Sequence, residues 1–315
     1  MSEPTSVKPL SEEELAILTE VAGLTELPTN GAFNVRINGG CSGRLSSDNI
    51  TITAKEDGTG IDITVAPGTM GETVFIPVVV SQSGLHDVVQ NDFYIGENSN
   101  VTIIAGCGIH NDSHDLAQHD GIHRFHVEAG ASLRYEEKHI GVGGGTGGRV
   151  LNPVTELVLG PKSSVLMETV QIRGVDSTNR VTSAVVGDGA SLVVSEKLMT
   201  HSDQTAQTEF NVELNGVESK TNIVSRSVAR GNSSQVFLSR INGNASCYGH
   251  SECDAIIMDN ATVQAIPEVS ANHVEASLIH EAAIGKIAGE QITKLMTLGL
   301  TEAEAEATIV EGFLK

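Results

Sequence analysis

Thiol, imidazole and carboxylate side chains gather near the C-terminal end of this sequence. Cys247, His250 and Cys253 lie in one short stretch, and the adjacent pair His280-Glu281 follows. The chain has only 4 cysteines, so this region holds half of them. Soft thiolate ligands together with imidazole and carboxylate suit iron or an iron-sulfur cluster best. The residue types therefore indicate iron chemistry in this region.

The spacing of these residues limits how they can act together. On one straight strand, the sulfurs of Cys247 and Cys253 would lie about 20 Å apart, so a shared cluster requires a turn between them, for example at Gly249. Adjacent residues of a strand point to opposite faces. Joint ligation by His280 and Glu281 therefore requires a bulge or a strand end. Otherwise only one of the two is a ligand, and the other supports it without contacting the metal. A buried cysteine that packs as a small apolar residue is the alternative for both thiols.

Five histidines in the segment CGIHNDSHDLAQHDGIHRFH could indicate a second metal site. They are His110, His114, His119, His123 and His126. Their spacing fits no zinc pattern, and on a strand His123 and Phe125 face one way while Arg124 and His126 face the other. Hydrogen-bonded turns or a protein interface are the favoured interpretation.

A glycine-rich segment at residues 143–149 resembles a phosphate-binding loop only loosely. It lacks the Gly-Lys-Ser/Thr ending that places a charge on the phosphates and a hydroxyl on magnesium. No other such loop occurs in the sequence, so we expect any ATP-driven step to be powered by a partner protein.

The charge balance excludes several classes of partner. Of 315 residues, 40 are acidic and 19 are basic, which gives a net charge of −21. This charge opposes binding to nucleic acid and to anionic membranes. The sequence contains no apolar run long enough to span a membrane and no signal-peptide pattern at its start. We therefore expect a soluble cytoplasmic protein whose few, widely spaced cysteines are reduced.

A recurring turn-and-strand unit predicts the fold. Only 3% of the residues are aromatic, while Gly and small or β-branched residues are frequent from about residue 29 onward. Short strands that follow a Gly, Asn or Asp turn are anchored at Val101, Leu133, Val165, Leu192, Lys220, Cys247 and Val263. The regular offsets, each corresponding to one or two coils, favour a parallel β-helix over a β-sandwich, which gives no reason for a repeat. We expect a mainly β protein.

Helical segments are predicted on both sides of the solenoid. Ser11 and Glu14 form a capping-box pattern at the start, and Thr301 and Glu304 repeat it near the end. Gly299 separates two C-terminal helices. The apolar positions of these helices include Ile292, Leu295, Met296, Ile309 and Phe313. Short helices with apolar faces must dock on the solenoid as a cap or on another protein.

Several motifs together resemble the SufB/SufD family of iron-sulfur cluster assembly proteins. They are Cys107-Gly-Ile-His110, His119-Asp-Gly-Ile-His123-Arg-Phe-His126, Glu168-Thr, Gly174-Val-Asp-Ser-Thr178, Asn222-Ile-Val-Ser-Arg226, Gly249-His250-Ser-Glu-Cys253-Asp, Pro267, His280-Glu-Ala, Gly285-Lys-Ile287, Glu290-Gln291 and Gly312-Phe313. The resemblance covers nearly the whole chain from about Asn34 onward. The Cys253-Asp and His280-Glu281-Ala282 elements and the helical tail are its most specific parts.

The resemblance implies a right-handed parallel β-helix at residues 29–273, between an N-terminal helical segment at 1–28 and a C-terminal strand with helices at 274–315. It implies a non-enzymatic scaffold that assembles a transient iron-sulfur cluster from iron and sulfur, and tail helices that dock a SufC-like ABC-type ATPase. Cys253 matches the family's key SufB cysteine, and His280 and Glu281 match interface residues associated with the cluster or iron. Cys247 and His250 are further candidates.

The sequence departs from the long form of SufB, because the region before the solenoid is reduced to about thirty residues. It is similar to a minimal scaffold of archaeal or anaerobe type, for which we expect self-pairing into a homodimer through the β-helix. A sulfur donor and acceptor apoproteins are further implied partners. A structural adaptor without metal chemistry and, less well supported, a carbohydrate-active β-helix enzyme are the alternatives.

Overall fold

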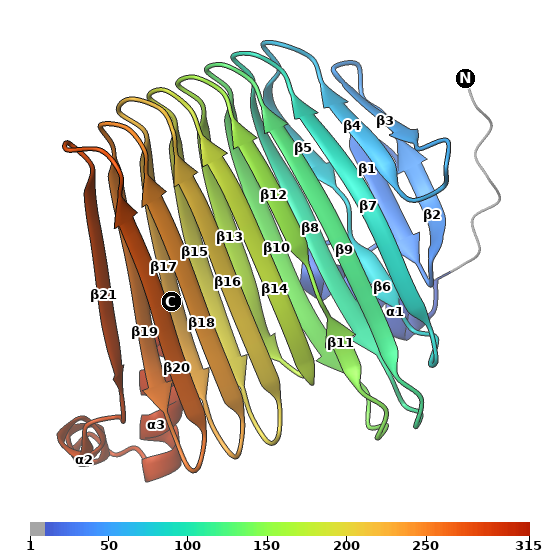
Figure 1. The fold of residues 1–315 in the computed structure, drawn as a ribbon. Coiled ribbons are helices and arrows are strands. Elements are labelled where there is room, and N and C mark those ends of the chain that lie inside the picture. Colours follow the sequence, from blue (N-terminus) through green and yellow to red (C-terminus); the bar gives the residue numbers. More distant parts are fainter. Residues whose placement is uncertain (1–9) are drawn as a thin grey trace.

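The computed structural model describes residues 10–315, so residues 1–9 of the predicted N-terminal helical segment lie outside the described part. Strands make up 56% of the chain and helices 10%, and the strands wind into a solenoid of about eight turns (Figure 1). The predicted mainly β solenoid with short flanking helices is therefore confirmed.

The solenoid consists of two sheets of mostly parallel strands. One sheet contains β1 (Ala32–Ile37), β2 (Gly40–Leu45), β5 (Met70–Phe75), β6 (Val78–Val80), β8 (Asn100–His110), β10 (Ser132–Val142), β13 (Ser164–Arg173), β15 (Ser191–Thr200), β17 (Lys220–Ala229), β19 (Tyr248–Ile257) and β21 (Ser277–Gly285). The other contains β3 (Ile50–Ala54), β4 (Ile61–Val65), β7 (His86–Ile95), β9 (Ala117–Val127), β11 (Arg149–Leu151), β12 (Val154–Leu159), β14 (Ser177–Val186), β16 (Thr205–Leu214), β18 (Ser234–Gly243) and β20 (Thr262–Ala271).

Each coil contributes one strand to each sheet over most of the solenoid. Leu133 of β10 pairs in register with Val101 of β8 and with Val165 of β13, which pairs in turn with Leu192. These are successive predicted anchors, so each of those offsets is one coil. Val263 is different, because it lies on β20 in the opposite sheet, half a coil further along.

Strand alternation separates a packed interior from the outer faces. In β15 and β16, buried residues alternate with partly exposed or exposed ones along the whole strand. Phe93, Phe125 and Tyr135 form the largest aromatic group inside, with ring centroids 4.3 Å apart for the first pair and 4.9 Å for the second. Small β-branched and aliphatic residues fill most of the remaining core. The interior is therefore a thin layer between the two sheets.

Helix α1 (Glu12–Ala22) covers the outer face of β8. The predicted capping box is present, because Ser11 Oγ accepts from the Glu14 amide and the Glu14 carboxylate accepts from the Ser11 amide. Ile17, Leu18 and Val21 are buried against the sheet. A Cβ atom on Gly106 would lie 2.5 Å from the carbonyl oxygen of Val21, which is closer than atoms can approach. Glycine at this position lets the helix backbone dock directly on the strand.

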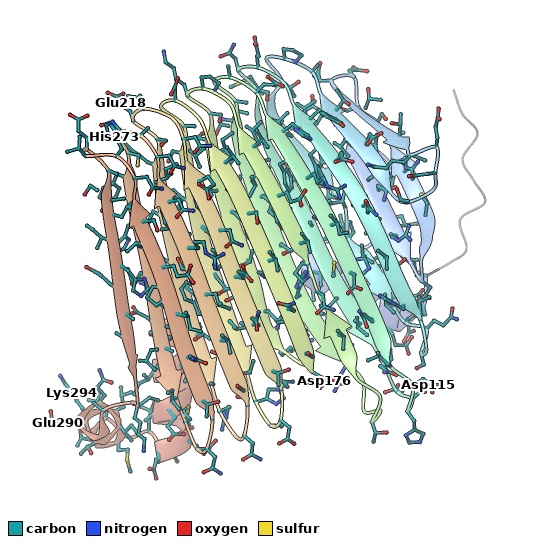
Figure 2. All side chains as sticks on the ribbon, viewed as in Figure 1. Asp115, Asp176, Glu218, His273, Glu290 and Lys294 are labelled. Carbon is teal, nitrogen blue, oxygen red and sulfur yellow. The ribbon has the colours of Figure 1, made fainter. Side chains whose placement is uncertain are left out.

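Two helices follow the last strand, α2 (Gly289–Thr297) and α3 (Glu302–Phe313). The predicted Thr301–Glu304 capping box begins α3. Turn residues Glu218 and His273 lie at one edge of the solenoid, and Asp115 and Asp176 lie at the opposite edge (Figure 2). Glu290 and Lys294 project from α2 beyond the last strands (Figure 2). Among residues 10–315, no helix has both the length and the apolar character needed to cross a membrane.

Replacing Gly106 by Ala should destabilise the protein by about 1–3 kcal/mol, because the new methyl group forces α1 away from β8. Gly144→Ala is the matched control, since a Cβ atom there meets nothing within 4 Å. Urea unfolding measures the free energy, and amide hydrogen exchange measures the protection of α1. Equal stability and equal α1 protection in both variants would contradict the close approach of this helix.

Candidate functional site

Four of the residues predicted for iron chemistry lie on the last two strands of their sheet, His250 and Cys253 on β19 and His280 and Glu281 on β21. The two strands pair in parallel from Tyr248 and Ser277 to Ile256 and Gly285 without a register shift. No bulge therefore brings His280 and Glu281 to one side of the sheet. The structure divides the predicted ligands between the inside and the outside of the final coil.

Cys253 and His280 belong to the inner face. Cys253 is 1% exposed and pairs with Ala282 of β21, while His280 pairs with Ser251. The two side chains are thus diagonal neighbours on the same face of adjacent strands, a separation that long side chains can bridge. Within the described chain, the buried Nδ1 atom of His280 has no hydrogen-bond partner. A thiol and an unpaired imidazole nitrogen therefore line the interior of the last coil.

The environment of Cys253 keeps its thiol neutral. Burial raises the pKa of this thiol to about 12, and the nearby carboxylates of Glu196 and Asp254 add to the effect. Burial also lowers the pKa of His280, with a smaller contribution from His250. A neutral thiol beside a neutral imidazole can accept a metal cation once the thiol loses its proton, because the cation compensates the thiolate charge.

A second group of ligands lies on the outer face of the same two strands. One side-chain nitrogen or oxygen atom each from His250, Glu252 and Glu281 lies within 4.8 Å of the others. His250 Nδ1 is 2.8 Å from the Asn222 side-chain oxygen, and its Nε2 is 3.7 Å from a Glu281 oxygen. With Asn222 as the acceptor, Nδ1 carries the proton and Nε2 presents its lone pair. Imidazole with two carboxylates is a ligand set that suits a divalent transition metal.

Glu252 is the member of this group that the sequence interpretation did not include. Burial raises its pKa, and the hydrogen bond and the charge of Asp254 raise it further. The His-x-Glu spacing from His250 to Glu252 placed both on one face of a strand, and this signal could have identified it. A bound cation would relieve the crowding of carboxylates here.

Cys247 lies apart from this site. It precedes β19, is 7% exposed and packs in the apolar core, where Gly243 is its close neighbour. Gly249 is an ordinary strand residue, paired with Thr221 and with Leu278, so the chain does not turn there. Without that turn, Cys247 and Cys253 are too far apart to share one cluster.

The histidine-rich segment contributes to the interior and to the surface. As predicted, His123 and Phe125 are buried while Arg124 and His126 face outward. His119 Nδ1 lies 3.0 Å from Asp87, and His123 Nδ1 lies 2.8 Å from the Tyr135 hydroxyl. Outside, His126 stacks on Tyr94. Within the described residues, no histidine of this segment belongs to a metal-ligand cluster.

The contact between His123 and Tyr135 is the first in a chain of interactions among buried polar groups. The Tyr135 hydroxyl donates to Glu137, and Arg180 forms ion pairs with Glu137 and Glu196. Although burial alone would raise the pKa of Glu137, Arg180 holds it well below its usual value, whereas burial raises the pKa of Glu196. The Ser225 hydroxyl donates to Glu196 at 2.6 Å, and Ser225 is the register partner of Cys253. The polar chain thus ends beside the thiol.

The residues predicted to bind a partner lie on the tail helices. Ile292 and Leu295 of α2 are partly buried, and so are Ile309 and Phe313 of α3, while Met296 is 45% exposed. The two helices contact each other. The main-chain oxygen of Lys315 accepts a hydrogen bond from Lys197 on β15, at 2.9 Å. This contact holds the end of the tail against the solenoid.

Comparison with known proteins gives one consistent result. A family model described as "SUF system FeS cluster assembly, SufBD core domain" matches residues 80–313. An "Iron-sulfur cluster assembly SufBD family protein" of Methanothermobacter thermautotrophicus is 30% identical over 222 residues, 69% of this chain and 53% of that protein. A protein of the same description from Archaeoglobus fulgidus is 29% identical over 282 residues, 86% of this chain and 73% of that protein.

A third similar protein, from Methanocaldococcus jannaschii, is 24% identical over 237 residues, which are 75% of this chain and 74% of that protein. The relatives differ in length. The chain spans 53% and 57% of the two Methanothermobacter relatives that it matches.

The outer group should bind a divalent transition metal. We expect Co²⁺, used as a spectroscopic probe, to bind the wild-type chain and to bind Glu281→Gln and His250→Asn at least about tenfold more weakly, because each variant removes one ligand. Glu268→Gln is the control, since this glutamate lies on the outer face of the other sheet and pairs with Arg240. Titration followed by visible absorption measures the affinity, and equal affinities in all four proteins would refute the site.

Protonation of His123 should weaken the fold in mild acid. Burial lowers its pKa to about 4, while an unfolded histidine titrates near 6.5. Because the folded pKa is the lower one, the contribution of neutral His123 to stability is complete above pH 6.5 and is lost as the pH falls towards 4. Protonation should therefore lower the free energy of unfolding by about 2 kcal/mol between pH 7 and pH 5.

Urea unfolding at both pH values tests this effect. In His123→Gln the loss of stability between pH 7 and pH 5 should be smaller by about 2 kcal/mol than in the wild type. If His123→Gln kept the pH dependence of the wild type, burial of His123 would not be its cause.

Proposed function

The chain belongs to the SufBD family of SUF-system iron-sulfur cluster assembly proteins, and we propose that it is a scaffold subunit on which a nascent cluster is built. The observation that carries this proposal is the ligand set of the final coil. Cys253 and His280 line its inner face, and His250, Glu252 and Glu281 lie on its outer face. Iron and the cluster are the cargo of this site.

A mixed ligand set suits a scaffold better than it suits a site that stores a cluster. Four thiolates on one rigid chain would hold a cluster tightly, whereas a thiolate with imidazole and carboxylate ligands holds it weakly enough for transfer. We propose that Cys253 accepts the cluster or its sulfur and that His280 is a neighbouring ligand. The outer group would collect iron next to them. Cys247, packed in the core away from the site, is no longer part of the proposed ligand set.

The open edge of the final coil supports pairing of two copies. In the described part of the chain, β21 has β19 as its one strand partner, so its other edge presents unpaired backbone groups. Such an edge is a template for a strand from another chain. Pairing of β21 with its copy around a two-fold axis would place two sets of Cys253, His280 and Glu281 together. We propose this homodimer, in which each copy supplies half of the ligands.

The tail helices support an energy-coupling partner. Met296 of α2 and Leu298 directly after it are 45% and 74% exposed, so the C-terminal end of this helix presents apolar side chains to solvent. We propose that an ABC-type ATPase of the SufC kind docks on α2 and α3. ATP hydrolysis would occur in this partner, which would shift the two solenoids relative to each other and open the cluster site. A sulfur donor and acceptor apoproteins in the cytoplasm complete the proposed reaction sequence.

Replacing Cys253 by Ser should abolish cluster assembly without unfolding the protein. Ser has nearly the same size, so the core is kept while the thiolate ligand is lost. Cys41→Ser is the matched control, because Cys41 is exposed at the other end of the solenoid. Iron and sulfide content and the visible charge-transfer bands are measured after anaerobic reconstitution, with the ATPase partner co-expressed.

The expected result is stoichiometric iron and sulfide in the wild type and in Cys41→Ser, and none in Cys253→Ser. Circular dichroism and copurification of the ATPase verify that the Cys253 variant is folded and able to dock. Normal cluster content in Cys253→Ser would remove this cysteine from the mechanism. An iron-free wild-type protein that still binds the ATPase would replace the scaffold proposal by an adaptor role.

A further inference from the structure

A cavity of about 170 Å³ lies at the opposite end of the solenoid from β19 and β21. Its lining combines polar residues with apolar ones, among them Ile61, Ile76, Val78 and Val89. Asn34, Arg36, Cys41 and Arg44 from the β1–β2 hairpin line one side, and Asn91 of β7 lines another. Cys41 is exposed at its rim, while Asn34 and Asn91 are 8% and 5% exposed. The first coils lie at the end opposite β21 in Figure 1, and several polar side chains form part of the wall of this cavity.

The hydrogen bonds around this cavity leave donors directed at it. Asn34 Oδ1 accepts from Arg44 Nε at 2.8 Å and lies 3.6 Å from the sulfur of Cys41. Because the Asn34 oxygen is used in this way, the amide presents its NH₂ group to the remaining space. Within the described chain, the two terminal nitrogens of Arg44 make no hydrogen bond and no ion pair. Arg44 and Asn34 together offer several N–H donors and no acceptor.

The two arginines differ in how their charge is balanced. Arg36 forms a two-point pair with Asp87, at 2.6 Å and 2.9 Å. Although burial alone would raise the pKa of Asp87, hydrogen bonds from Arg36 and His119 hold it well below its usual value, so this pair is neutral overall. None of the described residues that line the cavity is acidic. The guanidinium of Arg44 is therefore the uncompensated charge.

We propose that this cavity binds a small tetrahedral oxyanion of the sulfate and phosphate class, with Arg44 as its main ligand. A guanidinium presents paired N–H donors that match two oxygens of such an anion. The volume corresponds to about five or six water molecules, at roughly 30 Å³ each. It suits one such anion with some water and is too small for a nucleotide, whose sites usually exceed about 300 Å³.

The acidic surface makes this site distinctive. With a net charge of −21, the protein repels anions over most of its surface, so saturable anion binding requires a local excess of positive charge. The Arg44 cavity supplies it. The inference does not rest on the proposed cluster chemistry, because none of its residues belongs to the final coil.

Calorimetric titration of the full chain with sodium sulfate and with sodium phosphate, at constant ionic strength set by sodium chloride, tests the proposal. We expect saturable binding of one anion per chain. Arg44→Gln should weaken it about 10- to 100-fold, because the charged hydrogen bonds are lost. Asn34→Asp should abolish it, since the new carboxylate pairs with Arg44 without changing the volume. Arg240→Gln, far from the cavity, should bind within about twofold of the wild type.

Circular dichroism verifies that each variant is folded, and Asn34→Asp keeps the test decisive if Arg44→Gln is unstable. No saturable binding to the wild type would overturn the proposal. Unchanged binding in Asn34→Asp and in a folded Arg44→Gln would place the anion elsewhere and would also overturn it.

Discussion

In-register parallel stacking of the coils is the constraint on which the rest of the structure depends. Each strand forms backbone hydrogen bonds with the corresponding strands of the coils before and after it, so one register governs a whole sheet. Since side chains alternate with a period of two, the register also fixes which residues face the interior. Cys253 and His280 are inside and Glu281 is outside for this reason alone. Moving any of these residues to the other face would require a change in the register of β19 or β21.

A second constraint is that the interior tolerates charge only when it is balanced. Arg180 lies between Glu137 and Glu196, and each of the three side chains is 3% exposed or less. One guanidinium cannot neutralise two carboxylates in a dry environment, which explains why the pKa of Glu196 is raised while that of Glu137 is lowered. Ser225 connects this group of charges to the surroundings of Cys253, because it donates to Glu196 and is the register partner of Cys253. A charged thiolate there would need a cation, and arriving iron would supply one.

Local patterns in the sequence were sufficient to predict the solenoid, because its coils repeat the same turn-and-strand pattern. The capping boxes at Ser11 and Thr301 and the opposite facing of His123 and His126 followed from rules that act within a few residues. The outer ligand group could not be predicted from local patterns alone. Its members come from neighbouring strands, and the pairing of Glu252 with Glu281 depends on the length of the intervening coil. The Arg36–Asp87 and Arg180–Glu137 pairs join residues 51 and 43 positions apart, which no local pattern can reveal.

The two ends of the solenoid are built differently, and this difference supports a role for the C-terminal end in assembly. At the N-terminal end, the terminal strands β2 and β3 pair antiparallel with their neighbours, and β1–β2 carries a bulge that disturbs the edge. At the other end, β20 contains Pro267, which lacks an amide donor and weakens its edge for pairing. β21 contains no proline and pairs regularly along its length. Of the two sheets, the one that carries Cys253 and His280 thus keeps an edge suited to another strand. A strand added there would lie directly beside the candidate ligands.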